Sequence, residues 1–253
     1  MTAYRDGDGH GSIAAPTRAG TLSLTIGPRD LRLALDPRSV LLEGDFLSFE
    51  DGVRRRAGSG KKASERLGSR RLVVARDVPR EDLGLWLELD DGGMRRVFGA
   101  EPVDLITEGG LAALRSLDTL VARLRQALAG RAGGVRRAIE VGRGLDKVLL
   151  LDHGDRLVLY RRELFRDRAR RACEVHRDGT ILVVEKDRDL RANVRDRYGV
   201  SLLGDFIRFS DPTGLDLVRV AVPWVTREDR EELARRFGEL IHDDRPVDAA
   251  SGS

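Results

Sequence analysis

Short apolar segments separated by turn-forming residues recur along the whole chain, and this spacing is typical of a β-sheet meander. Leu31, Leu33 and Leu35 alternate with less apolar residues, which is the two-residue period of a half-buried strand. Asp90–Gly93 then separates two apolar segments with an acidic, glycine-rich turn, and glycine tolerates the positive φ that tight hairpins need. The pattern predicts a fold built mainly from antiparallel strands.

The strands expected from this pattern fall into two groups. The first group lies near Leu22–Ile26, Leu31–Leu35, Asp45–Phe49, Leu72–Ala75, Leu85–Leu89 and Met94–Phe98. The second group lies near Ala138–Val141, Val148–Leu151, Leu157–Tyr160, Ala172–His176, Ile181–Glu185, Phe206–Phe209 and Leu217–Val222. Arg177–Gly179 and Ser210–Gly214 have the composition of hairpin turns between members of the second group.

An amphipathic helix is predicted after each group of strands. From Leu111 to Gly130 the apolar residues follow the 3.6-residue period of a helix with one buried stripe. Thr226 with Asp229 resembles a capping box at the start of the second helix. Its expected buried stripe consists of Leu233, Phe237, Leu240 and Ile241.

This arrangement predicts two β-rich modules of an α+β protein. Each module is expected to have about seven antiparallel strands in a partly open barrel or sandwich, capped by its C-terminal amphipathic helix. We place the modules at residues 21–130 and 135–242, with residues 131–134 as a linker. The polar segments 1–20 and 243–253 are predicted to be a flexible N-terminal tail and a disordered C-terminal tail.

The ends of the two modules can be aligned, which indicates a diverged duplication. In the preferred alignment, Leu85–Leu89 and Asp205–Phe209 each precede a glycine turn, a second strand and a helix. In a competing alignment, Gly44–Phe49 matches Gly204–Phe209 more closely in letters but occupies a different place in its module. We interpret this second match as a recurrent hairpin sequence.

The element order resembles that of tandem bacterial pleckstrin-homology-like (PH-like) domains, in which a meander of strands is closed by one C-terminal helix. Ile106–Gly109 and Val222–Thr226, which lead into the two helices, carry the resemblance. It covers most of the chain and implies binding to lipid headgroups, peptides or partner domains, and only rarely catalysis. Function inferred from fold in this way is an analogy.

Composition favours a soluble cytoplasmic protein. The 253 residues contain a single cysteine, Cys173, which excludes an internal disulfide framework. Apolar runs such as Val148–Leu151 are far shorter than the ~20 residues that cross a bilayer, and residues 1–20 have no signal-peptide pattern. Arginine outnumbers lysine about ten to one and Asn193 is the only asparagine, which we interpret as the mark of a GC-rich bacterial genome.

The residues of common catalytic, metal and nucleotide sites do not occur at the required spacing. Cys173 and His176 are three residues apart on one predicted strand, so their side chains are expected on opposite faces of the sheet. Ala57–Lys62 contains Gly-Ser-Gly-Lys but lacks the preceding glycine and the following hydroxyl residue of a phosphate-binding loop. Glu185–Asp187 lacks the spacing of a nuclease core. We therefore expect neither catalytic residues nor a cofactor nor a metal site.

One segment, Val53–Arg71, stands out by its charge. It has eight basic residues and one acid, or +7, whereas residues 1–130 together have 20 basic and 19 acidic residues, so the rest of that half is at 1 − 7 = −6. The candidate binding residues are Arg54, Arg55, Arg56, Lys61, Lys62, Arg66, Arg70 and Arg71. A long connection of this kind is either functional or a solvated loop. A second basic stretch, Arg161–Arg171, contains acids and is interpreted as a polar connection.

These observations favour a non-enzymatic binding or scaffold protein with a protein partner, because the surface is rich in arginine with interleaved acids. The runner-up hypothesis is binding of an anionic membrane or nucleic acid through residues 53–71. An enzyme of unrecognised type is the third hypothesis. The identity of the partner and the oligomeric state have no signature in the sequence.

Overall fold

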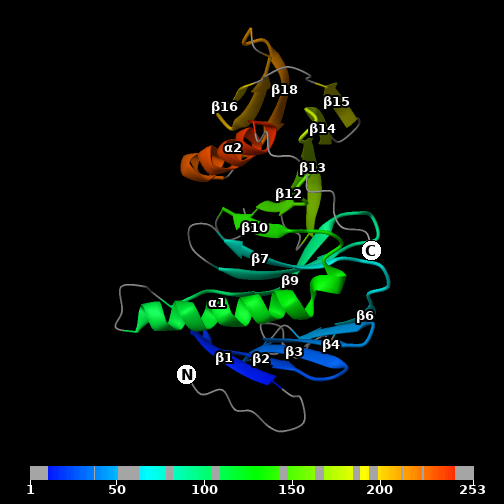
Figure 1. Cartoon of the computed structure of the whole chain (residues 1–253), viewed down its shortest axis with the longest axis vertical. Helices are drawn as coiled ribbons and strands as arrows, with labels where there is room; N and C mark the ends of the chain where they lie inside the picture. Colours follow the sequence, from blue (N-terminus) through cyan, green and yellow to red (C-terminus); the bar gives the residue numbers. More distant parts are fainter. Residues whose placement is uncertain are drawn as a thin grey trace, which may run out of the picture. The chain divides into compact units, whose positions relative to one another are not determined.

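The computed structural model of the protein is shown in Figure 1. It describes residues 11–36, 38–50, 63–77, 82–103, 109–142, 148–162, 168–184, 189–193, 199–211, 213–223 and 225–242.

The first sheet is an antiparallel meander in which each strand pairs with the next along the chain. Its strands are β1 (Gly11–Thr17), β2 (Gly20–Ile26), β3 (Asp30–Leu35), β4 (Arg38–Glu43), β5 (Phe46–Glu50) and β6 (Ala63–Arg66). In β3 the alternation expected from the sequence is observed, because Leu31, Leu33 and Leu35 are buried while Arg32 is exposed. The sheet therefore has one apolar inner face and one polar outer face.

The second sheet has the strand order β12–β11–β10–β7–β8–β9–β13–β14–β15, and β12 also pairs with β13. This extra pairing closes seven strands, β7 to β13, into a barrel. The strands are β7 (Leu72–Asp77), β8 (Leu83–Glu88), β9 (Met94–Ala100), β10 (Arg137–Val141), β11 (Val148–Asp152), β12 (Arg156–Arg162), β13 (Arg168–His176), β14 (Thr180–Val184) and β15 (Asp189–Asn193).

A third sheet has the order β16–β17–β18, with strands β16 (Gly199–Leu203), β17 (Phe206–Ser210) and β18 (Asp216–Ala221). The helices are α1 (Gly110–Ala127), followed by the short 3-10 helix η2 (Ala129–Arg131), and α2 (Arg227–His242). The chain divides into two compact units. Unit 1 comprises Met1–Asp90 and Arg95–Gly133, and unit 2 comprises Asp91–Met94 and Gly134–Ser253.

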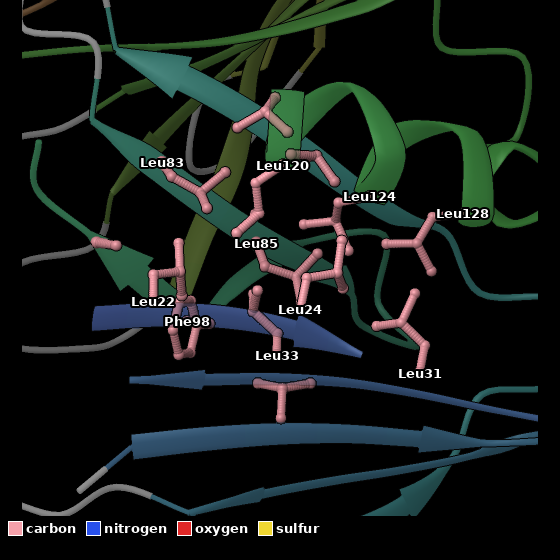
Figure 2. Close-up of a cluster of buried hydrophobic side chains, with 14 of the residues drawn as sticks. Leu22, Leu24, Leu31, Leu33, Leu83, Leu85, Phe98, Leu120, Leu124 and Leu128 are labelled. Carbon is pink, nitrogen blue, oxygen red and sulfur yellow. The ribbon is translucent and has the colours of Figure 1, made fainter. Parts of the chain in front are cut away.

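The core of unit 1 forms around the apolar stripe of α1, which is the stripe that the sequence predicts. Leu117, Leu120 and Leu124 are fully buried on α1. In Figure 2 the leucines of α1 point toward Leu24 and Leu85, which come from β2 and β8. Complete burial of a leucine side chain contributes about 1.5–3 kcal/mol, so this shared core holds the first sheet and the β7–β9 strands of unit 1 on the helix.

In unit 2, α2 packs mainly against β16, below the third sheet in Figure 1. The Thr226 hydroxyl accepts the backbone N–H of Asp229 at 3.2 Å, so the predicted capping interaction is confirmed. Phe237 of α2 is fully buried, and its ring meets that of Phe209 edge-on with centroids 5.7 Å apart. The inner face of the third sheet is thereby covered by α2.

The predicted α+β architecture of two helix-capped modules is wrong. The described part of the chain is mostly β, with two α-helices, and it contains a closed seven-stranded barrel in addition to other sheets. Local periodicity reports which residues form strands but not which strands pair across long separations in the sequence. The pairing of β12 with β13 that closes the barrel has no signal in the alternation of either strand.

Several strands were not predicted, because their sequences have little apolar alternation. β1 lies within the segment expected to be a tail, and β6, whose sequence is Ala-Ser-Glu-Arg, lies within the basic segment. β4, β15 and β16 were also missed. These strands are held by pairing with neighbours whose pattern is clear.

None of the described helices has the length and apolar character needed to cross a membrane.

Aspartate placed on the buried stripe of either helix is predicted to unfold or strongly destabilise the protein. Leu120→Asp and Phe237→Asp should each cost roughly 2–7 kcal/mol, because each buries a carboxylate without a partner. Arg123→Asp, on the exposed face of α1, is the control and should stay within about 0.5 kcal/mol. Chemical denaturation followed by circular dichroism measures all three. Similar losses in the three variants would contradict this assignment of the buried faces.

Candidate functional site

The basic segment was the predicted binding site, and the structure describes three of its eight candidate residues. Arg54, Arg55, Arg56, Lys61 and Lys62 lie outside the described residues. Arg66 ends β6, and Arg70 and Arg71 precede β7. Each of these three arginines is bonded to a carboxylate of unit 1.

Arg66 and Arg131 converge on Asp45, in the turn between β4 and β5. The Asp45 carboxylate accepts from Arg66 Nε at 2.9 Å and from Arg131 Nη1 at 3.0 Å. Arg131 also donates to the carbonyl oxygens of Gly68 and Gly44, at 3.1 and 3.3 Å. The hydrogen bond from Arg66, with further bonds from Arg131 and the Gly68 N–H, holds the pKa of Asp45 below its usual 3.8. This cluster ties the end of α1 to the first sheet.

Arg70 and Arg95 share the carboxylate of Glu65. Arg70 Nη1 donates to Glu65 Oε2 at 3.0 Å, and Arg95 Nη2 donates to Oε1. The guanidinium carbon of Arg95 lies 5.0 Å from the centre of the Phe49 ring, a cation–π arrangement. Arg70 Nε also donates to the carbonyl oxygen of Leu67 at 3.2 Å. Both guanidinium groups are therefore committed to contacts within unit 1.

Arg71 and Glu88 form a double link between the loop before β7 and the end of β8. The Arg71 side chain donates to Glu88 Oε1 at 2.6 Å, and its backbone N–H donates to Oε2 at 3.0 Å. Both side chains are largely buried. Arg66, Arg70 and Arg71 are thus each bonded to an acid of their own unit. Binding of an anion by the other five stays a prediction.

The two matching hairpin sequences form the same structure in both units. Gly44 and Gly204 have φ values of 56° and 59°, a left-handed conformation that glycine adopts with little strain. The aspartate after each glycine accepts a hydrogen bond on its backbone oxygen. The donor is the backbone N–H of the first residue after β6 in unit 1 and after β18 in unit 2. Leu67 N donates to Asp45 O at 2.8 Å, and Val222 N donates to Asp205 O at 2.9 Å.

Each aspartate side chain also accepts a hydrogen bond from an arginine. Asp205 accepts from Arg230 Nη1, in the first turn of α2, at 2.6 Å, whereas Asp45 accepts from Arg131, which follows the C-terminal end of α1. The phenylalanine that follows each aspartate is exposed, with 55% of Phe46 and 40% of Phe206 accessible to solvent. The two matching segments therefore form recurrent hairpins, as interpreted from the sequence.

The surroundings of the two exposed phenylalanines differ. The cross-strand neighbours of Phe46 are Glu43 and Arg66, both charged. The cross-strand neighbours of Phe206 are Leu203 and Ala221, both apolar. Residues directly opposite each other in antiparallel strands place their side chains on the same face. The face of the third sheet that points away from α2 therefore has an apolar row, which we name the outer row: Leu203, Phe206 and Ala221.

Exposed apolar side chains are concentrated on the third sheet, at both of its ends. Six large apolar side chains among the described residues are strongly exposed, and four of them belong to the third sheet and its turn: Leu203, Phe206, Leu215 and Leu217. Isolated exposed leucines are normal, whereas a group of them indicates an interaction surface. The signal available in the sequence was the pair Leu202–Leu203 before Gly204, which was missed because β16 itself was not recognised.

Cys173 and His176, which the sequence analysis considered as a possible pair, lie in β13. Among them, no group of three or more His, Cys, Asp or Glu side chains is arranged to hold a metal ion. Cys173 is fully buried in β13, and burial raises the pKa of its thiol to about 12. His176 Nε2 lies 3.0 Å from Glu174 Oε1, with Arg156 and Arg171 bonded to the same carboxylate. Cys173 therefore has the surroundings of a core residue.

The Asp45 cluster is predicted to stabilise the fold above the unfolded-state pKa of aspartate and to stop doing so in acid. Because the folded pKa lies below 3.8, the contribution is complete above about that pH and is lost as pH falls through the lowered value. Asp45→Asn should therefore destabilise the protein at neutral pH, and its difference from wild type should shrink below pH 3.8. Urea unfolding across this range measures both. Asp36→Asn, an exposed turn residue, is the control, and a pH-independent effect of Asp45→Asn would contradict the assignment.

Cys173 is predicted to be unreactive in the folded protein. Thiol reagents attack the thiolate, and a buried thiol with a pKa of about 12 is almost entirely protonated at neutral pH. Ellman's reagent should therefore react only as fast as the protein unfolds, and at once in denaturant. Rapid reaction of the folded chain with one equivalent of reagent would show that Cys173 is accessible.

Comparison with known proteins gives no assignment. No protein-family model matches the chain, and no curated protein or solved structure matches it. The resemblance to PH-like domains is therefore untested by relatives.

Proposed function

We propose that the chain is a non-enzymatic protein-binding protein and that the outer face of the third sheet is its contact surface. The observation that carries this proposal is the outer row, in which the exposed side chains of Leu203 and Phe206 are cross-strand neighbours. Leaving these side chains in water forgoes about 25 cal/mol for each Å² of apolar area that a partner could cover. Apolar and aromatic centres bordered by arginine are typical of the buried part of protein interfaces.

The first unit provides an internal comparison for this proposal. Its equivalent hairpin keeps the exposed phenylalanine, Phe46, but surrounds it with Glu43 and Arg66. An exposed phenylalanine is thus compatible with the hairpin in either setting, and the apolar neighbours of Phe206 are not required by the turn. The apolar row in unit 2 is therefore better explained by contact with a partner than by folding.

The alternative of an anionic membrane or nucleic acid bound by residues 53–71 has weaker support. Arg66, Arg70 and Arg71 are each bonded to a carboxylate of unit 1, namely Asp45, Glu65 and Glu88, and Asp45 and Glu65 are shared with Arg131 and Arg95. Affinity for phosphate depends on the number of cations available to replace counterions. Of the three described arginines of this segment, Arg70 and Arg71 are largely buried.

Site-specific photocrosslinking in the native host tests the proposal. With p-benzoylphenylalanine in place of Phe206, we expect a discrete crosslinked protein, and with the same residue in place of Phe46 we expect none. Leu203→Ser should weaken this contact by about tenfold or more, since residues at the centre of an interface dominate affinity. Equal crosslinking from both positions, or none from position 206, would overturn the proposal. Unchanged circular dichroism spectra would show that the variants remain folded.

A further inference from the structure

A row of arginines lies directly beside the outer row on the same face of the third sheet. Arg208 of β17 and Arg219 of β18 are cross-strand partners, and each lies two residues from a member of the outer row. Because side chains alternate between the two faces of a strand, the residues at a spacing of two share a face. The face therefore presents an apolar row next to a cationic row.

The cationic row has more positive than negative charge. Asp216 accepts hydrogen bonds from both arginines: from Arg219 Nε at 2.6 Å, and from Arg208 Nε. Two guanidinium groups therefore share one carboxylate. About half of the Arg219 side chain remains exposed, and Arg208 is partly exposed. The shared carboxylate fixes the position of both arginines while leaving a net positive charge on the face.

A third arginine adds to this charge at the edge of the face. The exposed residue Arg161 of β12 donates from Nη1 to the carbonyl oxygen of Ala221 at 3.2 Å. This bond places its guanidinium group next to the end of β18 where the outer row lies. A backbone carbonyl carries no net charge, so this contact orients Arg161 without neutralising it.

We propose that this face binds a protein segment in which apolar side chains stand next to carboxylates. This inference rests on the proposed function and specifies the chemistry of the partner. The apolar side chains would cover Leu203 and Phe206, and the carboxylates would pair with Arg208 and Arg219. A guanidinium group matches a carboxylate in planar, two-point geometry, and its ion pair strengthens when the partner excludes water.

The same two rows disfavour a basic partner and a phosphate-rich partner. A basic segment would place cations against two fixed arginines. A nucleic acid or an anionic bilayer would need several unneutralised cations, whereas Asp216 already balances one of the two arginines in the cationic row. An acidic segment with apolar side chains is the occupant that matches both rows.

Two peptide display libraries, selected against the full chain, test the inference. Both have positions randomised among Leu, Ile, Val and Phe. The positions between them are randomised among Asp, Glu, Ser and Gly in the acidic library, and among Lys, Arg, Ser and Gly in the basic library. We expect binders from the acidic library only. Vesicles containing an anionic phospholipid form a third arm, in which we expect no binding that depends on Phe206.

Variants with matched controls then locate the binding. Phe206→Ser and Arg219→Gln should each weaken the selected acidic peptides by about tenfold or more, which is the effect expected of central interface residues. Phe46→Ser and Arg66→Gln make the same changes at the equivalent hairpin of unit 1 and should leave affinity within about twofold of wild type. Thermal unfolding of all four variants confirms that they are folded.

The outcomes separate this inference from the proposed function. Basic peptides whose binding is lost in Phe206→Ser would overturn the acidic partner while keeping the outer face as the contact surface. Binding of acidic peptides that is unaffected by Phe206→Ser and Arg219→Gln would overturn the inference, as would selection of no binder from the acidic library. Vesicle binding that is lost in both Phe206→Ser and Arg219→Gln would show that the partner of this face is a membrane and not a protein segment. The crosslinking result from position 206 tests the proposed function separately, because it does not depend on any of these four peptide and vesicle outcomes.

Discussion

The packing of leucines from α1 against the strands of unit 1 is the interaction on which the rest of that unit depends. Leu117, Leu120 and Leu124 form a stripe that contacts the inner face of the first sheet and strands of the second, so a single helix completes two apolar surfaces (Figure 2). The Asp45 cluster then ties the residues after α1 to the β4–β5 hairpin through Arg131. Apolar burial supplies most of the stabilisation, and the charged bonds determine where the end of the helix lies.

Unit 2 uses the same combination of a buried helix stripe and an aspartate hairpin. Phe237 of α2 packs against Phe209, and Arg230 of α2 is bonded to Asp205 in the turn. The shared turn geometry accounts for the similar letters of the two hairpins: a glycine with positive φ, an aspartate that accepts hydrogen bonds on its backbone oxygen and its carboxylate, and a phenylalanine after them. What differs is the outer face, where Glu43 and Arg66 of unit 1 correspond to Leu203 and Ala221 of unit 2. Similar folding requirements with a different exposed surface are what a separate binding role would produce.

The arginines of the two units have different surroundings. In unit 1, Arg66, Arg70 and Arg71 are bonded to Asp45, Glu65 and Glu88 and join neighbouring segments of the fold. In unit 2, Arg208 and Arg219 share one carboxylate, so the same residue type leaves a net charge beside apolar side chains. The first group stands out in the sequence because eight basic residues lie close together there. In the structure Arg70 and Arg71 are largely buried, whereas about half of the Arg219 side chain is exposed beside the outer row.

The sequence by itself determined the elements whose residues carry their own periodic signal. The stripe of α1, the capping residue Thr226 and the alternation of Leu31, Leu33 and Leu35 all follow from local backbone geometry. Only the tertiary structure decided the closure of the barrel and the neighbours of Phe206, since each of these depends on which strands pair. The physical reason is that strand periodicity records which side chains are buried, whereas pairing is selected by the free energy of the whole assembled sheet. The candidate surface belongs to this second class, because it exists only where β16, β17 and β18 lie side by side.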